Sequence, residues 1–258
     1  GMRTRCWPTF GCKGSNRPLM LADSSDRHVQ IGSLGKDVHL SAASLDELIE
    51  FIAGELPCWR DHPDRSEKTA ETALTSQLCG HLNTVARHSA GWDILQFRIE
   101  EPDEQKKGRK IDLIASACGP TIWIDGRRCT QFDTLLPIEC KRLPTPKDKD
   151  RDEREYVINR KATTGGIQRF KAGDHGAAHS RAAIIAYVQA ETPQVWFDRL
   201  NAWITELDGS EHTGWSLQDL IRSESVVGKT GLTMYRSQHV RAKGLSQIDI
   251  RHLWIAMK

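Results

Sequence analysis

The sequence predicts an α/β protein with a central mixed β-sheet and helices on both of its faces. Three observations support this class. Stretches with helical spacing of apolar residues alternate with short apolar runs between residues 66 and 207. The most apolar run, 182–188, suits a buried strand and is too short to span a bilayer. The 258 residues, 38% of them hydrophobic, are enough for one elaborated domain with a sizeable core.

Charge and cysteine content exclude several classes of protein. The formal net charge of +2 argues against a wholly basic, histone-like binder, although a local basic surface stays compatible with it. The seven cysteines are scattered and form no Cys-x-x-Cys pair, which argues against a zinc ribbon or a thioredoxin-type motif. This use of cysteine favours a reducing compartment, and the chain start lacks the apolar block of a secretory signal. We therefore expect a soluble, cytoplasmic protein without a membrane partner.

Glycine and proline divide the first part of the chain. They interrupt every periodic segment of residues 1–40, which predicts an irregular N-terminal arm before a domain over residues 41–258. Ser44–Ile52 has a helical stripe, and Ser44 with Glu47 is typical of a capping box. The stretch from Gly54 to Pro63 is expected to end this helix.

A second helix is predicted to begin near Ser66, with an apolar face that runs to Leu82. Glu71 lies next to that face, because Leu74 and Leu78 follow it at three and seven residues. An acid at this position either borders solvent or points into a site.

Two acids and a lysine occur in predicted strands. Asp112 lies near the start of the apolar run 110–117, and residues 110–125 have the pattern of a hairpin around Gly119. Glu139 and Lys141 lie in the strand 135–143, where the two-residue period places them on one face and Cys140 on the other. A buried acid in a strand needs a partner, a proton or a metal ion.

The other elements follow from the same patterns. A strand is expected at 92–99. Helical segments are expected at 155–158, 165–170 and 193–207. Further strands are expected at 181–189, 232–240 and 248–257.

The acids and the lysine resemble a known motif. Asp112 in Lys110-Ile111-Asp112-Leu113 and the run Glu139-Cys140-Lys141 resemble the PD-(D/E)XK nuclease superfamily, with Ile111 where the proline of the name would stand. Glu71 looks like the helical acid common in that group, and Glu67 is its rival. Gln168 looks like the polar residue that many members place on the following helix. The resemblance covers about residues 66–190.

The resemblance implies a fold and a chemistry. The fold would be a restriction-endonuclease-like core of αβββαβ order with C-terminal β/α additions. The activity would be Mg²⁺-dependent hydrolysis of DNA, with Mn²⁺ as a substitute ion. The implied metal ligands are Asp112, Glu139, the backbone carbonyl of Cys140, and Glu71. Lys141 would orient or activate the attacking water, and Gln168 or Arg169 would contact the phosphate.

Double-stranded DNA is the expected partner, in restriction, phage defence or repair. A cut through both strands needs two active sites, so a homodimer is considered as well. Two alternatives stay open: a non-catalytic nucleic-acid-binding module on the same fold, and a structural ion-pair cluster in an unrelated α/β protein. The last would follow if Asp112 and Glu139 pointed to different faces of the sheet.

Overall fold

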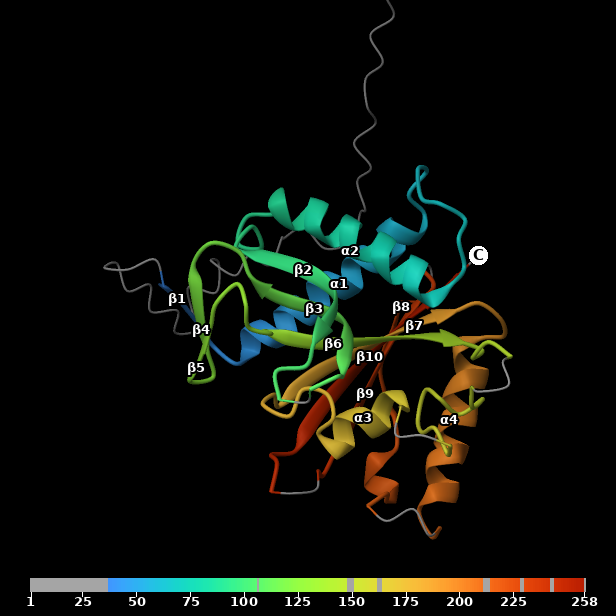
Figure 1. Cartoon of the computed structure of the whole chain (residues 1–258). Helices are drawn as coiled ribbons and strands as arrows, with labels where there is room; N and C mark the ends of the chain where they lie inside the picture. Colours follow the sequence, from blue (N-terminus) through green and yellow to red (C-terminus); the bar gives the residue numbers. More distant parts are fainter. Residues whose placement is uncertain are drawn as a thin grey trace, which may run out of the picture.

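The computed structural model describes residues 37–105, 107–147, 151–161, 164–210, 214–227, 230–241 and 244–257 (Figure 1). The predicted irregular arm, residues 1–40, lies outside this part of the chain except for its last four residues, which form a strand. The elements in chain order are β1 (Asp37–Leu40), α1 (Ala43–Arg60), α2 (Glu71–Arg87), β2 (Leu95–Pro102), β3 (Lys110–Ala117), β4 (Thr121–Ile124), β5 (Arg127–Cys129), β6 (Leu136–Leu143), α3 (Gly166–Ala172), β7 (Arg181–Val188), α4 (Pro193–Leu207), the short 3₁₀ helix η1 (Leu217–Asp219), β8 (Arg222–Val227), β9 (Leu232–His239) and β10 (Ile248–Ala256).

A mixed seven-stranded sheet forms the centre of the molecule. Its strand order is β2-β3-β6-β7-β10-β9-β8; β7 runs parallel to both β6 and β10, and the other neighbours are antiparallel. Helices α1 and α2 lie on one face and α3 and α4 on the other (Figure 1). The α/β class with helices on both faces of a mixed sheet is confirmed.

Each face of the sheet has its own apolar layer. Leu48, Leu78 and Cys140 belong to the layer under α1 and α2, and Phe170 and Leu200 to the layer under α3 and α4. Because strand side chains alternate, strand β6 contributes to both layers. Leu136, Ile138 and Cys140 face α1 and α2, whereas Leu143 packs in the layer under α3 and α4. Glu139 and Lys141 lie on the same side of β6 as Leu143, toward α3.

The predicted hairpin over 110–125 is wrong. Strands β3 and β4 belong to different sheets: β4 pairs with β1 and β5 in a separate three-stranded sheet. Strand β3 lies between β2 and β6, which occupy both of its edges. No edge of β3 is therefore free for β4, although Gly119 has the positive φ of 95° that suits a tight turn.

Helix α1 is longer than predicted, and α2 begins later. Helix α1 continues past Gly54 and Pro57 to Arg60, because the apolar stripe extends to the buried Trp59. Its N-cap is Ala42, without a side-chain cap, so the cap predicted at Ser44 is wrong. Helix α2 begins at Glu71 instead of near Ser66.

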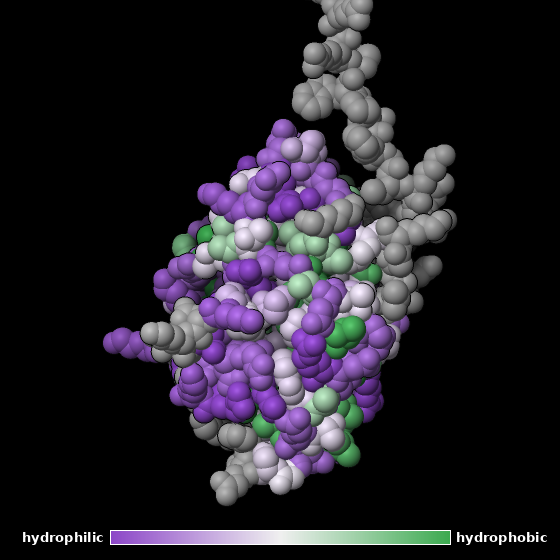
Figure 2. All heavy atoms as spheres, turned by 90° about the vertical axis from the view of Figure 1, so that its right-hand side faces the viewer, coloured by the Kyte–Doolittle hydropathy of each residue, from purple (hydrophilic) through white to green (hydrophobic). Residues whose placement is uncertain are grey.

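The segment 155–158, predicted to be helical, lies in turns and irregular chain. Helix α4 has the predicted bounds, and β7, β9 and β10 match the predicted strands to within one or two residues. Strand β8 was not predicted. On the face shown in Figure 2, hydrophilic side chains cover most of the described surface and apolar side chains form small, separate groups. Among the described residues, no helix is long and apolar enough to cross a membrane.

Candidate active site

The site forms where strand β3 separates from strand β6. The two strands pair only from Leu113 opposite Ile138 to Ala115 opposite Leu136. Beyond this ladder, the Asp112 carboxylate replaces the backbone partner: its Oδ2 accepts a hydrogen bond of 2.8 Å from the backbone N–H of Cys140. A strand end that would otherwise leave a backbone donor unpaired is thus closed by an acidic side chain.

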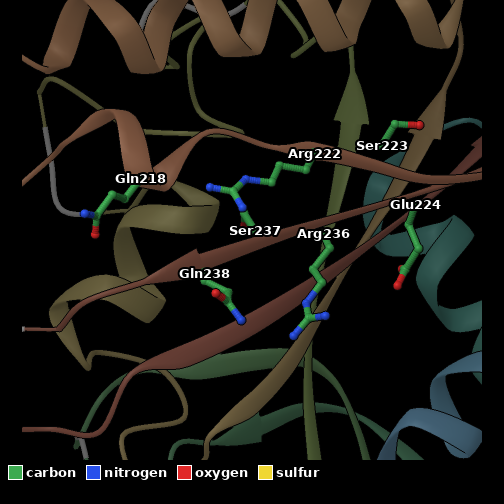
Figure 3. A pocket seen from close by; sticks show the side chains of 7 residues that line it. All are labelled: Gln218, Arg222, Ser223, Glu224, Arg236, Ser237 and Gln238. Carbon is green, nitrogen blue, oxygen red and sulfur yellow. The ribbon is translucent and has the colours of Figure 1, made fainter.

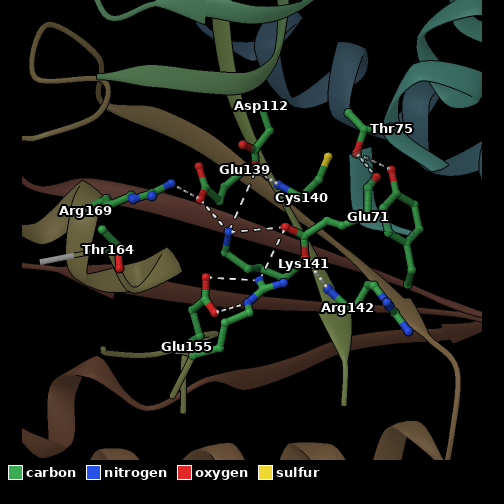
Figure 4. A network of polar contacts seen from close by, with 12 residues as sticks. Glu71, Thr75, Asp112, Glu139, Cys140, Lys141, Arg142, Glu155, Thr164 and Arg169 are labelled. Atoms are coloured by element: carbon green, nitrogen blue, oxygen red, sulfur yellow. Dashed lines mark hydrogen bonds and ion pairs between the residues drawn. The ribbon is translucent and has the colours of Figure 1, made fainter. Parts of the chain in front are cut away.

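Glu71 closes the next backbone donor of β6 in the same way. Its Oε2 accepts a 3.0 Å hydrogen bond from the backbone N–H of Arg142. Glu71 is the first residue of α2, where the positive end of the helix dipole favours a carboxylate. The two acids therefore approach β6 from a strand and from a helix, and they meet beside the charged face of β6 (Figure 4).

Lys141 lies among three carboxylates. Its Nζ is 2.7 Å from Glu139 Oε1, 3.8 Å from Asp112 Oδ2 and 4.0 Å from Glu71 Oε1. Burial alone would lower the pKa of Lys141, but these carboxylates, Glu139 most strongly, raise it above its ordinary value. The side chain is therefore an ammonium ion at neutral pH. Figure 4 shows the four predicted residues converging on one point, with Asp112 and Glu139 on the same face of the sheet.

Glu139 is fully buried and keeps its charge through three donors. Besides Lys141, Arg169 Nη1 lies 2.5 Å from Oε1, and His175 Nδ1 lies 3.1 Å from Oε2. Burial would raise the pKa of Glu139, but Lys141, the His175 hydrogen bond and Arg169 together hold it well below its usual range. Asp112 behaves differently: burial and the Glu139 charge raise its pKa to about 6.

Gln168 does not reach the carboxylates. Its Oε1 accepts hydrogen bonds from the backbone N–H groups of Gly165 (3.1 Å) and Asn159 (3.2 Å), so it joins the start of α3 to the preceding segment. Gln168 therefore contacts the backbone in this arrangement, and not the carboxylates of the candidate site. Its neighbour Arg169, the predicted alternative for a phosphate contact, is the α3 residue that enters the site.

Sequence reasoning missed His175 and Arg151. His175 follows α3 after a turn with Gly173 in the left-handed region, and no spacing in the sequence marks it. Arg151 Nη2 lies 3.7 Å from Glu71 Oε1 and 3.1 Å from Glu155 Oε1. Arg151 lies in a run of alternating charged residues, 147–155, and nothing in the sequence distinguishes it from the other charged residues there.

Of the two candidate helical acids, Glu67 and Glu71, only Glu71 lies beside Lys141 and β6. Glu67 lies before α2, exposed, and borders a separate groove of about 550 Å³ together with Arg65, Lys68 and Gln189. Only Glu71 of the two contacts Lys141 and the backbone of β6.

The carboxylates suit a magnesium ion in their chemistry but not yet in their spacing. Mg²⁺ prefers hard oxygen ligands, which Asp112, Glu139 and Glu71 supply. A hollow of about 50 Å³, bordered by Glu71 and Asp112, is wide enough for a few water-sized groups. Within the described ranges, however, no three His, Cys, Asp or Glu side chains are placed so that they could hold a metal ion.

A pocket larger than the hollow beside Glu71 and Asp112 lies away from the carboxylate group. It measures about 280 Å³ and lies over β8 and β9 (Figure 3). Its lining is polar and charged: Gln218, Arg222, Ser223, Glu224, Arg236, Ser237 and Gln238. None of the predicted site residues borders it, so size alone does not locate the candidate chemistry.

A buried Ser-His-Asp series lies next to this pocket. Ser237 Oγ is 2.7 Å from His239 Nε2, and His239 Nδ1 is 2.7 Å from Asp219 Oδ1. The same hydroxyl also lies 2.8 Å from His252 Nε2. Ser237 is only 2% exposed and bridges two histidines, which fits a polar link in the core better than a nucleophile.

Comparison with known proteins adds no assignment. A scan against models of known families, a search of curated proteins and a search of solved structures each found no match to this chain.

Proposed function

We propose that this chain is a metal-dependent nuclease that hydrolyses DNA phosphodiester bonds, on a PD-(D/E)XK-type core. The observation that carries the proposal is the convergence of Glu71, Asp112, Glu139 and Lys141. They come from α2, β3 and β6, which are remote in sequence, and they form one partly open charged group. A hydrolase of phosphodiesters needs such a combination of hard acidic ligands and a fixed positive charge.

The order of elements supports the same proposal. Helix α2, strands β2, β3 and β6, helix α3 and strand β7 follow one another as αβββαβ, once β4 and β5 are set aside as an insertion. Strands β2, β3 and β6 form an antiparallel meander, and β7 joins β6 in parallel. Asp112 lies on β3, and Glu139 and Lys141 lie on β6, in agreement with what the resemblance implies.

Each side chain has a role that its surroundings favour. Asp112 and Glu71 border the hollow, and with Glu139 they are the oxygen ligands that a Mg²⁺ ion would use once they moved closer together. When bound, such an ion polarises the phosphoryl oxygens and lowers the pKa of a coordinated water. The Lys141 ammonium, which lies among the three carboxylates, would offset negative charge on the phosphate. Arg169 donates a hydrogen bond to the Glu139 carboxylate, and from this position it would contact a phosphate bound beside the carboxylates.

A second candidate is a non-catalytic nucleic-acid-binding module on the same fold. One observation favours it: Lys141 neutralises the carboxylates in the arrangement described, where an active site would place a divalent ion. The two candidates differ in one measurable property, which is metal-dependent cleavage.

The test uses the purified full chain with supercoiled plasmid and with linear duplex DNA, in Mg²⁺, in Mn²⁺ and in a chelator. Cleavage should require the metal. Asp112→Asn and Glu71→Gln should each lower the rate by about 100-fold or more, because each removes a charge close to the reacting phosphate. Asparagine keeps an oxygen that can accept the Cys140 N–H bond, so the fold should survive the Asp112 change.

Glu67→Gln is the matched control. It removes an acid of the same type, four residues from Glu71 and outside the carboxylate group, so cleavage should stay within about twofold of the wild-type rate. If no divalent metal supports cleavage of any DNA or RNA substrate while nucleic acid still binds, the binding module is the better description. Equal losses in the Glu67 and Glu71 variants would argue against the site itself.

A further inference from the structure

Three carboxylates that could hold a divalent ion already surround a cation of the protein. The Lys141 ammonium lies 2.7 Å from Glu139, 3.8 Å from Asp112 and 4.0 Å from Glu71. Its side chain is 5% exposed, so the ammonium lies within the group and not at its solvent rim. The position that a bound cation needs is thus filled by Lys141.

The ammonium also explains the spacing of the acids. Ligand oxygens lie about 2.1 Å from Mg²⁺, whereas these oxygens lie 2.7–4.0 Å from Nζ. Carboxylates arranged around Lys141 are therefore too far from a common centre to hold a small ion. This accounts for the lack of a ready metal site in the described residues.

Charge leads to the same conclusion. Glu71, Asp112 and Glu139 carry three negative charges, and Lys141 and Arg169 bring two positive charges to them. Arg151 adds a third positive charge, which it shares between Glu71 and Glu155. A divalent ion added to this nearly balanced group would leave an excess of positive charge unless a cation moved away. Lys141 is the one that contacts all three acids.

We propose that Lys141 and a divalent metal ion compete for the same three carboxylates, so that metal binds as the ammonium moves toward the phosphate of the substrate. This rests on the proposed function in taking these carboxylates as the metal site. The phosphodiester would then replace the carboxylates as the partner of Lys141. Metal and DNA therefore bind cooperatively, and by reciprocity each increases the affinity for the other by the same factor.

The experiment measures Mn²⁺ affinity without DNA, by the electron paramagnetic resonance signal of free Mn²⁺. Lys141→Met removes the competing charge and should tighten Mn²⁺ binding by at least about tenfold, which corresponds to about 1.4 kcal/mol. Lys141→Arg keeps the charge and should stay within about threefold of wild type. Asp112→Asn added to Lys141→Met should abolish the gain.

The outcomes separate this inference from the proposed function. If wild type cleaves DNA but Lys141→Met binds Mn²⁺ no more tightly than wild type, competition is wrong and the nuclease stands. If the wild type does not cleave DNA, whereas Lys141→Met binds Mn²⁺ more tightly than the wild type, the competition is supported and the proposed nuclease activity is contradicted. Unchanged affinity without cleavage contradicts both.

Lys141→Met leaves three acids facing one another and could fail to fold without metal. A soluble protein obtained only in the presence of Mn²⁺ would then support the proposal directly. If it is insoluble in both conditions, Arg169→Met decides: it removes the second cation on Glu139 and should also raise Mn²⁺ affinity, by a smaller factor than Lys141→Met. An unchanged affinity in that variant overturns the proposal.

Discussion

Glu139 shows how a single buried charge fixes its surroundings. The carboxylate has no contact with solvent, and it stays ionised because Lys141, Arg169 and His175 each direct a donor at it. A buried charge that loses one partner is costly, since the remaining groups cannot regain the lost hydration. The three donors therefore stabilise the fold as well as the position of Lys141.

Arg169→Met should consequently lower the free energy of unfolding by about 2 kcal/mol, because it leaves Glu139 with two donors. Urea denaturation followed by circular dichroism measures this change. Lys110→Met is the control: the Lys110–Glu100 pair is exposed on both sides, and its loss should cost no more than about 0.5 kcal/mol. Similar losses in the two variants would contradict the role given to Arg169.

The buried His252 is expected to make the stability of the fold depend on pH. Its ring is fully buried, with Nδ1 2.7 Å from Tyr156 Oη and Nε2 2.8 Å from Ser237 Oγ, and burial, followed by the nearby His239, holds its pKa well below the usual value. In the unfolded chain the ring takes up a proton near pH 6.5. Below that pH the unfolded state binds the additional proton, so stability falls as pH falls, by up to about 1.4 kcal/mol per pH unit for this residue.

Denaturant unfolding between pH 7.5 and pH 5 tests this. The wild-type free energy of unfolding should decrease over this range, and His252→Gln should be less stable at pH 7.5 but show a shallower slope. The raised pKa of Asp112 acts in the opposite direction, because that carboxyl binds its proton earlier in the folded state. The comparison of slopes removes this contribution, since both proteins contain Asp112. Parallel slopes would show that His252 does not titrate as described.

At the scale of elements, helix α3 reaches the site because its first turn lies directly on the preceding segment. A Cβ added at Gly165 would lie 2.4 Å from Ile158 Cα, closer than real contacts allow. Gly165→Ala should therefore lower stability by about 2 kcal/mol and reduce cleavage, because α3 carries Arg169. Gly80→Ala is the matched control within α2, where an added Cβ meets nothing within 4 Å.

The control should raise the free energy of unfolding by about 0.5–1 kcal/mol, since alanine is favoured over glycine inside a helix. Thermal denaturation of both variants gives the comparison. If Gly165→Ala is neutral, α3 has freedom that its contacts do not suggest, and the link between α3 and Glu139 must be weaker than described.

Elements with a regular apolar pattern were predictable, and elements placed by distant partners were not. Helix α4 has a cap, a proline at its start and a full stripe, so its bounds follow from local sequence. The prediction of a hairpin over 110–125 was wrong because β3 pairs with β2 on one edge and with β6 on the other. No local sequence pattern indicates this pairing. Helix α1 continued through Gly54 and Pro57 because burial of Leu56 and Trp59 outweighs two unfavourable residues.

The candidate site divides in the same way. Asp112, Glu139 and Lys141 were recognisable because charged residues are unusual in apolar strands, and the structure places them together. His175 was not, because a single histidine in a loop carries no pattern of its own. Gln168 was assigned to the site from the resemblance alone, whereas its amide oxygen accepts hydrogen bonds from the backbone of Gly165 and Asn159.

At the scale of the whole molecule, the segment that carries the motif is not a separate unit. Strand β10, from the end of the chain, lies between β7 and β9 in the middle of the sheet, and α1 covers the face that α2 leaves open. The motif-bearing stretch of residues 66–190 lacks both. Without β10, its strand β7 would expose a row of unpaired backbone N–H and C=O groups along one edge.

A fragment of residues 66–190 should therefore fail to fold alone. We expect a far-ultraviolet circular dichroism spectrum without a cooperative thermal transition, while the full chain unfolds cooperatively. Adding residues 191–258 without 37–65 should not restore the transition, because the apolar layer under α1 stays uncovered. A folded, cooperative 66–190 fragment would show that the C-terminal strands are accessory and not part of the core.

Strand β6 also bears on how the chain can change over evolutionary time. Cys140 packs under α1 and α2 while Glu139 and Lys141 turn to α3, so one codon gained or lost within β6 would exchange the two sets. Such an event would place two charges in an apolar layer and remove the site in the same step. Divergence here should proceed by substitution, whereas the turn at Asp125 and Gly126, between β4 and β5, can change in length.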